Sequence, residues 1–224
     1  MNVALFRAFP DSYRLSMARY AADIEQRVGM FLKPGESIRS ECLPNPRIDG
    51  TWTRYWDQYV EYGRYAKAHA ADVNHIVDHG YGHLTTSLPA GRTIVSFHDA
   101  VVMKVPNVSW RTKFSLRRSL KAMQHAAAIV CPSEAAKKDL LALAPLPEAR
   151  LHVIPIGIDE QFRPPADREA VRQRLRLSRP VVLMVGHTQG YMNVDGMLRV
   201  VADVRARGLD VQLLKIGLPF TPEQ

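Results

Sequence analysis

The sequence has little cysteine and no long apolar segment. Its 224 residues include only Cys42 and Cys131, too few for a fold held together by several disulfides. The N-terminal stretch MNVALF reaches Arg7 too soon to be the core of a signal peptide, and no run of 18 apolar residues occurs. We therefore expect a protein of a reducing compartment, the cytoplasm.

The motifs of several enzyme classes are also absent. The first apolar strand leads into RAFPDSYRLSMARYA, which has no glycine, whereas a dinucleotide-binding turn needs glycine so that the backbone can approach a pyrophosphate. There is no P-loop, no G-x-S-x-G elbow, no zinc-protease helix and no Asp-x-Asp pair. The missing glycines argue against a nicotinamide or flavin enzyme, and the other absences argue against the enzyme classes that use those motifs.

The composition is that of a globular protein with a basic surface. Hydrophobic residues make up 46% and charged residues 23% of the chain, and the formal net charge is +8. This charge favours an anionic partner such as a phosphorylated ligand, a membrane surface or nucleic acid. Because the chain has no aromatic stacking platform and no recognisable reading helix, we do not expect nucleic acid.

Short β-branched runs alternate with helical patterns, which predicts an α/β fold with a parallel sheet covered by helices on both faces. The predicted strands are residues 3–6, 74–77, 93–97, 128–131, 152–154, 181–185 and 211–216. The predicted helices are residues 12–26, 52–70, 111–127, 133–144, 168–175 and 193–207.

A domain boundary is expected near Pro165, where proline and charge become frequent. This divides the chain into a domain over 1–165 and a smaller piece over 166–224. The smaller piece has too few residues to bury a core of its own, so we expect either missing sequence or a partner that completes it.

Three histidines, His75, His79 and His83, have the spacing of metal ligands on a helix. The surrounding letters VNHIVDHGYGH, with β-branched residues and two glycines, favour a strand followed by a loop instead. On a strand, residues four apart are separated by roughly 13 Å, too far to share one ion. We expect no metal site.

The letters IVSFHDA place His98 and Asp99 where a parallel strand ends, the edge at which open α/β sheets bind ligands. Two interpretations remain open. The pair can belong to a binding site, or His98 can be satisfied by backbone while Asp99 caps the next segment.

The predicted helix over 111–127 carries Lys113, Arg117 and Lys121 along one stripe. Such a stripe can lie on anionic lipid, which would place the protein at the inner face of the membrane. The alternative is a core helix with a solvated basic face.

Three further motifs lie at predicted strand ends. In CPSEAAKKDL, Ser133 is a good N-cap for a helix. VIPIGIDEQFRP places Gly157 and Asp159 after a strand, and VGHTQGYMNV forms a strand-to-helix turn that begins at Gly186. Turns of this last kind bind phosphates.

Taken in order, these motifs resemble the retaining glycosyltransferases of family 4, which have the GT-B fold. The resemblance implies two Rossmann-like domains, of which the first mainly binds the acceptor and the second mainly the nucleotide-sugar donor. It implies sugar transfer with retained configuration and without a metal. It places His98 near the transferred sugar, and Asp99, Gly157 and Asp159 at the cleft wall.

The resemblance also places Gly186, His187 and Asn193 against the donor diphosphate. The family commonly has an arginine and a lysine there, in a pattern like Arg-Lys-Asn, but this chain has YMN at 191–193. His187 is the only titratable cation of that turn, and Arg19 is a further cation expected to face the diphosphate.

Family members usually continue to an acidic pair, Glu-x7-Glu, which this chain does not reach. We therefore expect a glycosyltransferase that is C-terminally incomplete and lacks most of the donor site. It would act on a glycan or lipid-linked acceptor, and it would need no cofactor, since the nucleotide-sugar is a substrate. The alternative is a non-catalytic, truncated or split-subunit binding module whose basic face meets a membrane or a partner polypeptide.

Overall fold

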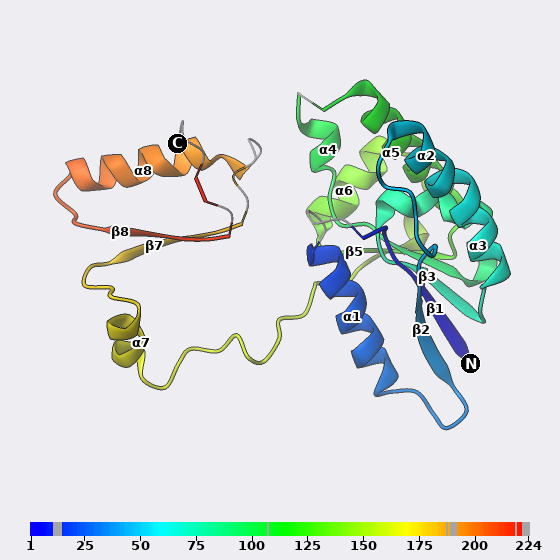
Figure 1. Cartoon of the computed structure of the whole chain (residues 1–224), viewed down its shortest axis with the longest axis horizontal. Coiled ribbons are helices and arrows are strands. Elements are labelled where there is room, and N and C mark those ends of the chain that lie inside the picture. Colours follow the sequence, from blue (N-terminus) through cyan, green and yellow to red (C-terminus); the bar gives the residue numbers. More distant parts are fainter. Residues whose placement is uncertain (11–14, 107, 187, 189–191, 218, 221–224) are drawn as a thin grey trace. The chain divides into compact units, whose positions relative to one another are not determined.

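The chain forms two compact units, Met1–Ile156 and Gly157–Gln224. The computed structural model describes residues 1–224 except 11–14, 107, 187, 189–191, 218 and 221–224 (Figure 1). The division lies earlier than the boundary expected near Pro165. Residues 157–167, which follow the division, contain neither helix nor strand.

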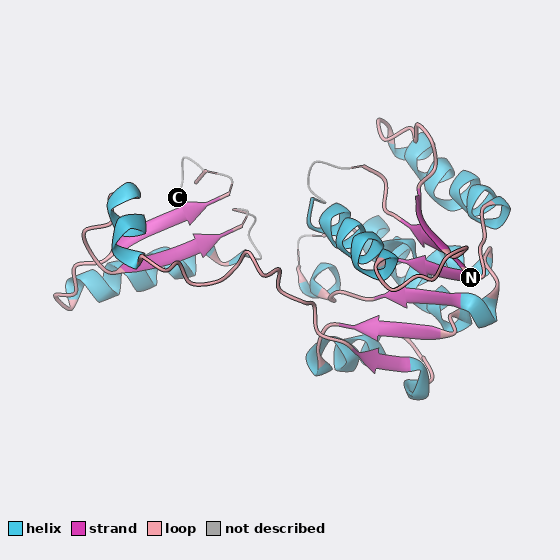
Figure 2. Cartoon of the chain, turned by 90° about the horizontal axis from the view of Figure 1, so that it is seen from below, coloured by secondary structure: helices cyan, strands magenta, loops and turns pink. Residues whose placement is uncertain are grey.

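The first unit is built on a six-stranded parallel sheet with the order β2-β1-β3-β4-β5-β6 (Figure 2). Its strands are β1 (Asn2–Phe6), β2 (Ser37–Glu41), β3 (Val73–Ile76), β4 (Thr93–Ser96), β5 (Ala128–Cys131) and β6 (Leu151–Val153). Within the sheet Val3 of β1 pairs with Ile38 on one side and with Val73 on the other. Five of the six strands were predicted, because apolar and β-branched residues fill them.

Strand β2 was not predicted. Its sequence SIRSE is mostly polar, and only Glu41 is buried. The strand lies at the edge of the sheet and pairs with β1 alone, so it needs no apolar residues on both faces. A pattern search for buried strands therefore misses it.

The four helices predicted for the first unit are present with shifted ends, one of them is divided, and the short helix α4 was not predicted. The helices of this unit are α1 (Leu15–Gly29), α2 (Thr51–Trp56), α3 (Tyr62–Ala68), α4 (Val101–Lys104), α5 (Trp110–Ala122) and α6 (Glu134–Leu143). The helix predicted over 52–70 is divided, because a π-helical turn, Asp57–Glu61, joins α2 to α3. Ser133 caps α6 as expected, since its hydroxyl accepts from the amide of Ala136 at 3.2 Å.

A 3₁₀ helix, η2 (His79–Thr86), occupies the segment expected to be a loop. The Asp78 carboxylate begins it by accepting from the amide of Gly80 at 2.7 Å. Gly82 packs closely on α5, because a Cβ at this position would lie 2.8 Å from the carbonyl oxygen of Ser119. Gly82, one of the glycines that suggested a loop, thus permits close packing of η2 on α5.

Alternate residues of β1 face different layers. Val3 and Leu5 pack in one cluster with Ala21 of α1. On the other face, Ala4 and Phe6 join a larger cluster that includes residues of α3, α5 and α6. The first unit therefore has helices on both faces of a buried sheet, as predicted.

The second unit contains one β-α-β motif and a short preceding helix. Its elements are α7 (Arg168–Arg174), β7 (Val181–Val185), α8 (Val194–Ala206) and β8 (Gln212–Ile216). Strands β7 and β8 pair in parallel as a two-stranded sheet. No helix in the described part of the chain is both long and apolar enough to cross a membrane.

Candidate functional site

His98 lies where β4 ends, at the carboxyl edge of the first sheet. Its Nε2 is 2.8 Å from the carbonyl oxygen of Val77, which can only accept, so Nε2 carries the proton. The ring also meets the ring of Tyr20 edge-on, with centroids 4.9 Å apart. None of the described residues hydrogen-bonds to Nδ1, so this nitrogen is available to a ligand.

Asp99 follows on the exposed side of the same edge. Its Oδ1 accepts from the amide of Val101 at 2.9 Å, at the start of α4. The contacts proposed for a purely structural pair, a backbone-bonded histidine and a capping aspartate, are therefore present. They leave the Nδ1 of His98 open, so both interpretations of this pair are compatible with the geometry.

A chain of partly buried polar groups lies beside His98. The hydroxyl of Ser96 is 2.8 Å from the Nε2 of His75 and 3.0 Å from the hydroxyl of Tyr20. Burial, with a smaller contribution from His98, lowers the pKa of His75 to about 4, so its imidazole is neutral near pH 7. The network fixes Tyr20 of α1, which contacts the ring of His98. Tyr20 and Ser96 were not predicted as site residues.

The histidines at 75, 79 and 83 have separate partners. His79 packs on Phe97 with ring centroids 4.9 Å apart, and its Nδ1 is 3.4 Å from the amide of His98. His83 is buried beneath α5, where its Nε2 bonds to the carbonyl of Gln58 at 2.8 Å, and burial lowers its pKa to about 4. No group of three metal-ligating side chains occurs among the described residues.

Arg7, which follows β1 at the same edge, was missed by the sequence analysis. Its Nε is buried and has no hydrogen-bond partner among the described residues. The backbone of Arg7, by contrast, is well bonded: its amide donates to Glu41 at 2.9 Å and its carbonyl accepts from Tyr62 at 2.6 Å. In the sequence, the placement of a cation directly after an apolar strand could have indicated Arg7 as a site residue.

The predicted phosphate-binding turn of the second unit begins at Gly186, whose φ is +133°, a conformation that favours glycine. Lys215 of β8 lies beside it, with Nζ 2.6 Å from the carbonyl oxygen of Gly186. His187 is the only titratable cation within the turn, and Lys215 adds a second cation from the neighbouring strand. Lys215 was missed because the pairing of β7 with β8 brings it there from 29 residues away.

Of the two other residues predicted for this turn, the structure describes only Asn193. His187 lies outside the described residues. Asn193 precedes α8 in a left-handed conformation with φ of +51°, and its side chain makes no capping bond to the helix. Gly196 leaves room for that side chain, because a Cβ there would lie 2.5 Å from the Asn193 amide nitrogen.

The remaining predicted residues are Arg19 in the first unit and Gly157 and Asp159 in the second. Arg19 on α1 is exposed and lies 4.0 Å from the carboxylate of Asp23. Gly157 is the first residue of the second unit, and the carboxylate of Asp159 accepts from the amide of Gln161 at 3.0 Å. These positions do not test the role predicted for Arg19 at the donor diphosphate or the role predicted for Gly157 and Asp159 at the cleft wall.

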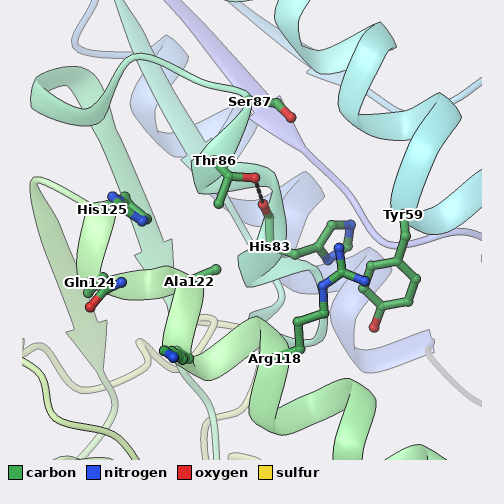
Figure 3. A pocket seen from close by; sticks show the side chains of 9 residues that line it. Tyr59, His83, Thr86, Ser87, Arg118, Ala122, Gln124 and His125 are labelled. Atoms are coloured by element: carbon green, nitrogen blue, oxygen red, sulfur yellow. Dashed lines mark hydrogen bonds between the residues drawn. The ribbon is translucent and has the colours of Figure 1, made fainter.

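A cavity of about 230 Å³ opens on the first unit beside α5 (Figure 3). Arg118, Lys121 and His125 line it together with the hydroxyl-bearing Thr86 and Ser87. The segments that supply these residues lead into the amino ends of β4 and β5, so the cavity lies away from the carboxyl edge that holds His98. None of its nine lining residues is acidic.

Known proteins similar to this chain are glycosyltransferases or share their fold. The alpha-D-kanosaminyltransferase of Streptomyces kanamyceticus is 29% identical over 117 residues, which are 50% of this chain and 28% of that enzyme. The apo form of the lipopolysaccharide outer core galactosyltransferase WaaB has a similar structure. Its TM-score is 0.54 at 12% identity, with 97% of this chain and 68% of that chain covered.

Anabaena HepE, solved in complex with UDP and glucose, is similar with a TM-score of 0.53 at 15% identity, covering 96% of this chain and 69% of that chain. The architecture is therefore α/β of the GT-B type, with one complete Rossmann-like domain and the first β-α-β part of a second, as predicted. The sequence model of Glycosyltransferase Family 4 matches residues 18–162. The chain belongs to Glycosyltransferase Family 4.

Proposed function

We propose that this chain is part of a glycosyltransferase that moves a sugar from a nucleotide-sugar to a glycan or lipid-linked acceptor with retained configuration. The observation that carries the proposal is the family match, which covers most of the unit that bears His98. Nucleotide-sugar use is supported by the similarity to HepE, whose structure holds UDP and glucose. The match spans 28% of the kanosaminyltransferase, so the activity is proposed for the whole protein.

In this proposal the first unit orients the sugar and the acceptor. His98 presents Nδ1, which accepts from a sugar hydroxyl while Nε2 stays bonded to Val77. Tyr20 limits rotation of the ring, so the nitrogen is directed before the substrate arrives. Arg7 offers its guanidinium to an acidic group of the acceptor, which would satisfy the buried Nε.

In the second unit the turn at Gly186 receives the donor diphosphate. Departure of a nucleoside diphosphate concentrates negative charge on the phosphates, and a fixed cation lowers the free energy of that state. Lys215 supplies such a cation beside Gly186, and the amides at the start of α8 add donors. Asn193 and His187 remain candidate contacts in this turn. No metal is needed in this arrangement.

Titration calorimetry of the chain with UDP, GDP and TDP tests the donor side. We expect one nucleotide to bind, binding to be insensitive to EDTA, and Lys215→Met to weaken it by about tenfold, the loss of one charge-assisted hydrogen bond. Arg199→Met, which removes an exposed cation from α8 of the same unit, is the matched control and should bind normally. His98→Ala should leave the nucleotide affinity of the chain unchanged and should abolish sugar transfer by the whole protein.

A second candidate function is a non-catalytic binding module completed by a partner polypeptide. It is favoured by the apolar side chains that the second unit exposes, Leu183 and Val185 on β7 and Ile216 on β8. If the chain is folded and monomeric by circular dichroism and ultracentrifugation but binds no nucleotide diphosphate, the module is supported and the donor site is rejected.

A further inference from the structure

All three tryptophans of the chain are exposed. Trp52 and Trp56 on α2 are 83% and 50% exposed, and Trp110 at the start of α5 is 72% exposed. Tryptophan is on average one of the more buried residue types, so three exposed ring systems in one unit require an explanation. Large exposed apolar side chains gathered in one place mark interaction surfaces.

The exposed side of α5 combines aromatic and cationic side chains in one stripe. Trp110, Phe114, Arg117 and Lys121 follow one another at spacings of four, three and four residues, which places them on one face of a helix. Phe114 is 60% exposed. The opposite side of the helix packs into the core through buried residues such as Leu120. The cationic stripe expected from the sequence thus also contains two aromatic rings.

Helix α2 lies beside α5 and extends this surface (Figure 1). A guanidinium nitrogen of Arg118 donates to the hydroxyl of Tyr55 at 2.9 Å. The same guanidinium lies 4.9 Å from the centre of the Tyr59 ring, in the turn that follows α2. These contacts hold α2 and α5 together, so the tryptophans of α2 and the stripe of α5 form one surface, which we call the aromatic–cationic face.

The aromatic–cationic face has cations and no acidic residue on its two helices. The sequences TWTRYW and WRTKFSLRRSLKA contain neither aspartate nor glutamate. Their basic residues are Arg54, Arg111, Lys113, Arg117, Arg118 and Lys121. Arg118 and Lys121 also line the cavity of about 230 Å³ that has no acidic lining residue (Figure 3). Glu61, which follows α2, accepts from the indole of Trp56 at 2.8 Å and is also paired with Arg64 at 3.0 Å. The cations of the two helices still outnumber this carboxylate, so the face complements a surface of phosphates.

We propose that the aromatic–cationic face docks the protein on an anionic lipid bilayer. Tryptophan and phenylalanine partition into the boundary between headgroups and acyl chains, while lysine and arginine remain at the level of the phosphates. Six cations on two helices that carry no carboxylate favour a layer of phosphates over a protein surface, which carries charges of both signs. Exposed rings that partition into the acyl boundary favour a bilayer over a nucleic acid. The cavity beside Lys121 accepts a lipid headgroup phosphate.

Vesicle flotation with the full chain tests the docking. We expect binding to vesicles that contain phosphatidylglycerol and none to pure phosphatidylcholine, with a blue shift of tryptophan emission on binding. Each cation near an anionic surface contributes about 1 kcal/mol, so Arg117→Gln with Lys121→Gln should lower the partition coefficient by about thirtyfold. Trp110→Ser with Phe114→Ser should weaken binding comparably and reduce the blue shift, which Trp52 and Trp56 alone then report.

Matched control variants remove an aromatic ring or two cations from another part of the first unit. Phe31→Ser replaces another exposed aromatic residue, and Arg27→Gln with Lys33→Gln removes two exposed cations, all three near the connection from α1 to β2. These variants should bind anionic vesicles as the unchanged chain does. Raising the ionic strength from about 0.1 M to about 1 M, which shortens the screening length from about 10 Å to about 3 Å, should release the chain.

Three outcomes overturn the proposal. The first is equal binding to neutral and anionic vesicles. The second is an aromatic variant, Trp110→Ser with Phe114→Ser, that is folded by circular dichroism and binds as well as the unchanged chain. The third is salt-sensitive binding to an oligonucleotide without binding to vesicles, which would assign the face to nucleic acid. Docking and nucleotide binding are separate measurements, so failure of one leaves the other standing.

Discussion

Replacing Arg7 by methionine should raise the stability of the ligand-free chain. The buried Nε of Arg7 has no partner among the described residues, and an unsatisfied buried donor costs about 1–3 kcal/mol. Methionine keeps an unbranched apolar stem, and the hydrogen bonds of this residue to Glu41 and Tyr62 use only the backbone, so both survive. We therefore expect a gain in the free energy of unfolding of about 1 kcal/mol.

Differential scanning calorimetry measures the gain as a rise in the melting temperature of about 2–4 °C, the shift expected per kcal/mol for a unit of this size. Arg27→Met, at an exposed site on α1, is the control and should change stability by no more than about 0.5 kcal/mol. Inorganic phosphate or glucuronate should stabilise the unchanged chain and not Arg7→Met. A variant that melts below the unchanged chain by several degrees would show that the guanidinium stabilises the fold, and the reasoning would be wrong.

Three further perturbations have defined outcomes. Gly82→Ala should destabilise the first unit by about 1–3 kcal/mol in urea titrations, because the added Cβ would lie 2.8 Å from the carbonyl oxygen of Ser119. Gly217→Ala should disrupt the end of β8, seen as loss of amide-exchange protection, because φ is +115° and the Cβ would lie 2.3 Å from a carbonyl oxygen of the neighbouring turn. Lowering the pH should destabilise the chain through His75 and His83, since burial holds both pKa values at about 4 in the folded state, against an ordinary 6.5. The unfolded chain takes up these protons first, so the free energy of unfolding should fall between about pH 6.5 and pH 4, by about 3 kcal/mol for each histidine, and His83→Gln should flatten the measured curve.

Control variants distinguish these effects from nonspecific destabilisation of the fold. Gly91→Ala adds a Cβ that meets nothing within 4 Å, so it should leave stability within about 0.5 kcal/mol. Gly82→Ala with unchanged stability would mean that η2 and α5 are not in close contact. A free energy of unfolding that stays constant from pH 7 to pH 4 would contradict the burial of both imidazoles.

Strands with a continuous apolar or β-branched run were predictable, including β7, whose Leu183 and Val185 are exposed. β5 and β7 have the predicted bounds, and the order of strands and helices indicated the correct fold class. The π-helical turn at Asp57–Glu61 was not predictable from periodicity, since it changes the hydrogen-bond pattern without interrupting the amphipathic sequence. The 3₁₀ helix at 79–86 depends on contacts with α5, which no local pattern contains.

The candidate site was likewise predictable only in part. The position of His98 at the carboxyl edge followed from the strand that precedes it. The partners of His98 did not, because Tyr20 comes from α1 and Val77 from the end of β3, and their contact depends on how helix and strands pack. Lys215 illustrates the same limit: the sequence shows a lysine in a strand, but only the pairing of β7 with β8 brings it to Gly186.

The polar sequence of β2, which prevented its prediction, protects the edge of the sheet. An outermost strand leaves a row of backbone donors and acceptors that a strand from another molecule can join, the first step toward aggregation. In β2 the exposed positions carry Ser37 and Arg39, and the guanidinium of Arg39 is bonded to Glu41 and to the carbonyl of His69. Charge at this edge strand discourages pairing with a strand of another molecule, so changing Ser37 and Arg39 to valine would raise the strand propensity of β2 and lower the solubility of the protein.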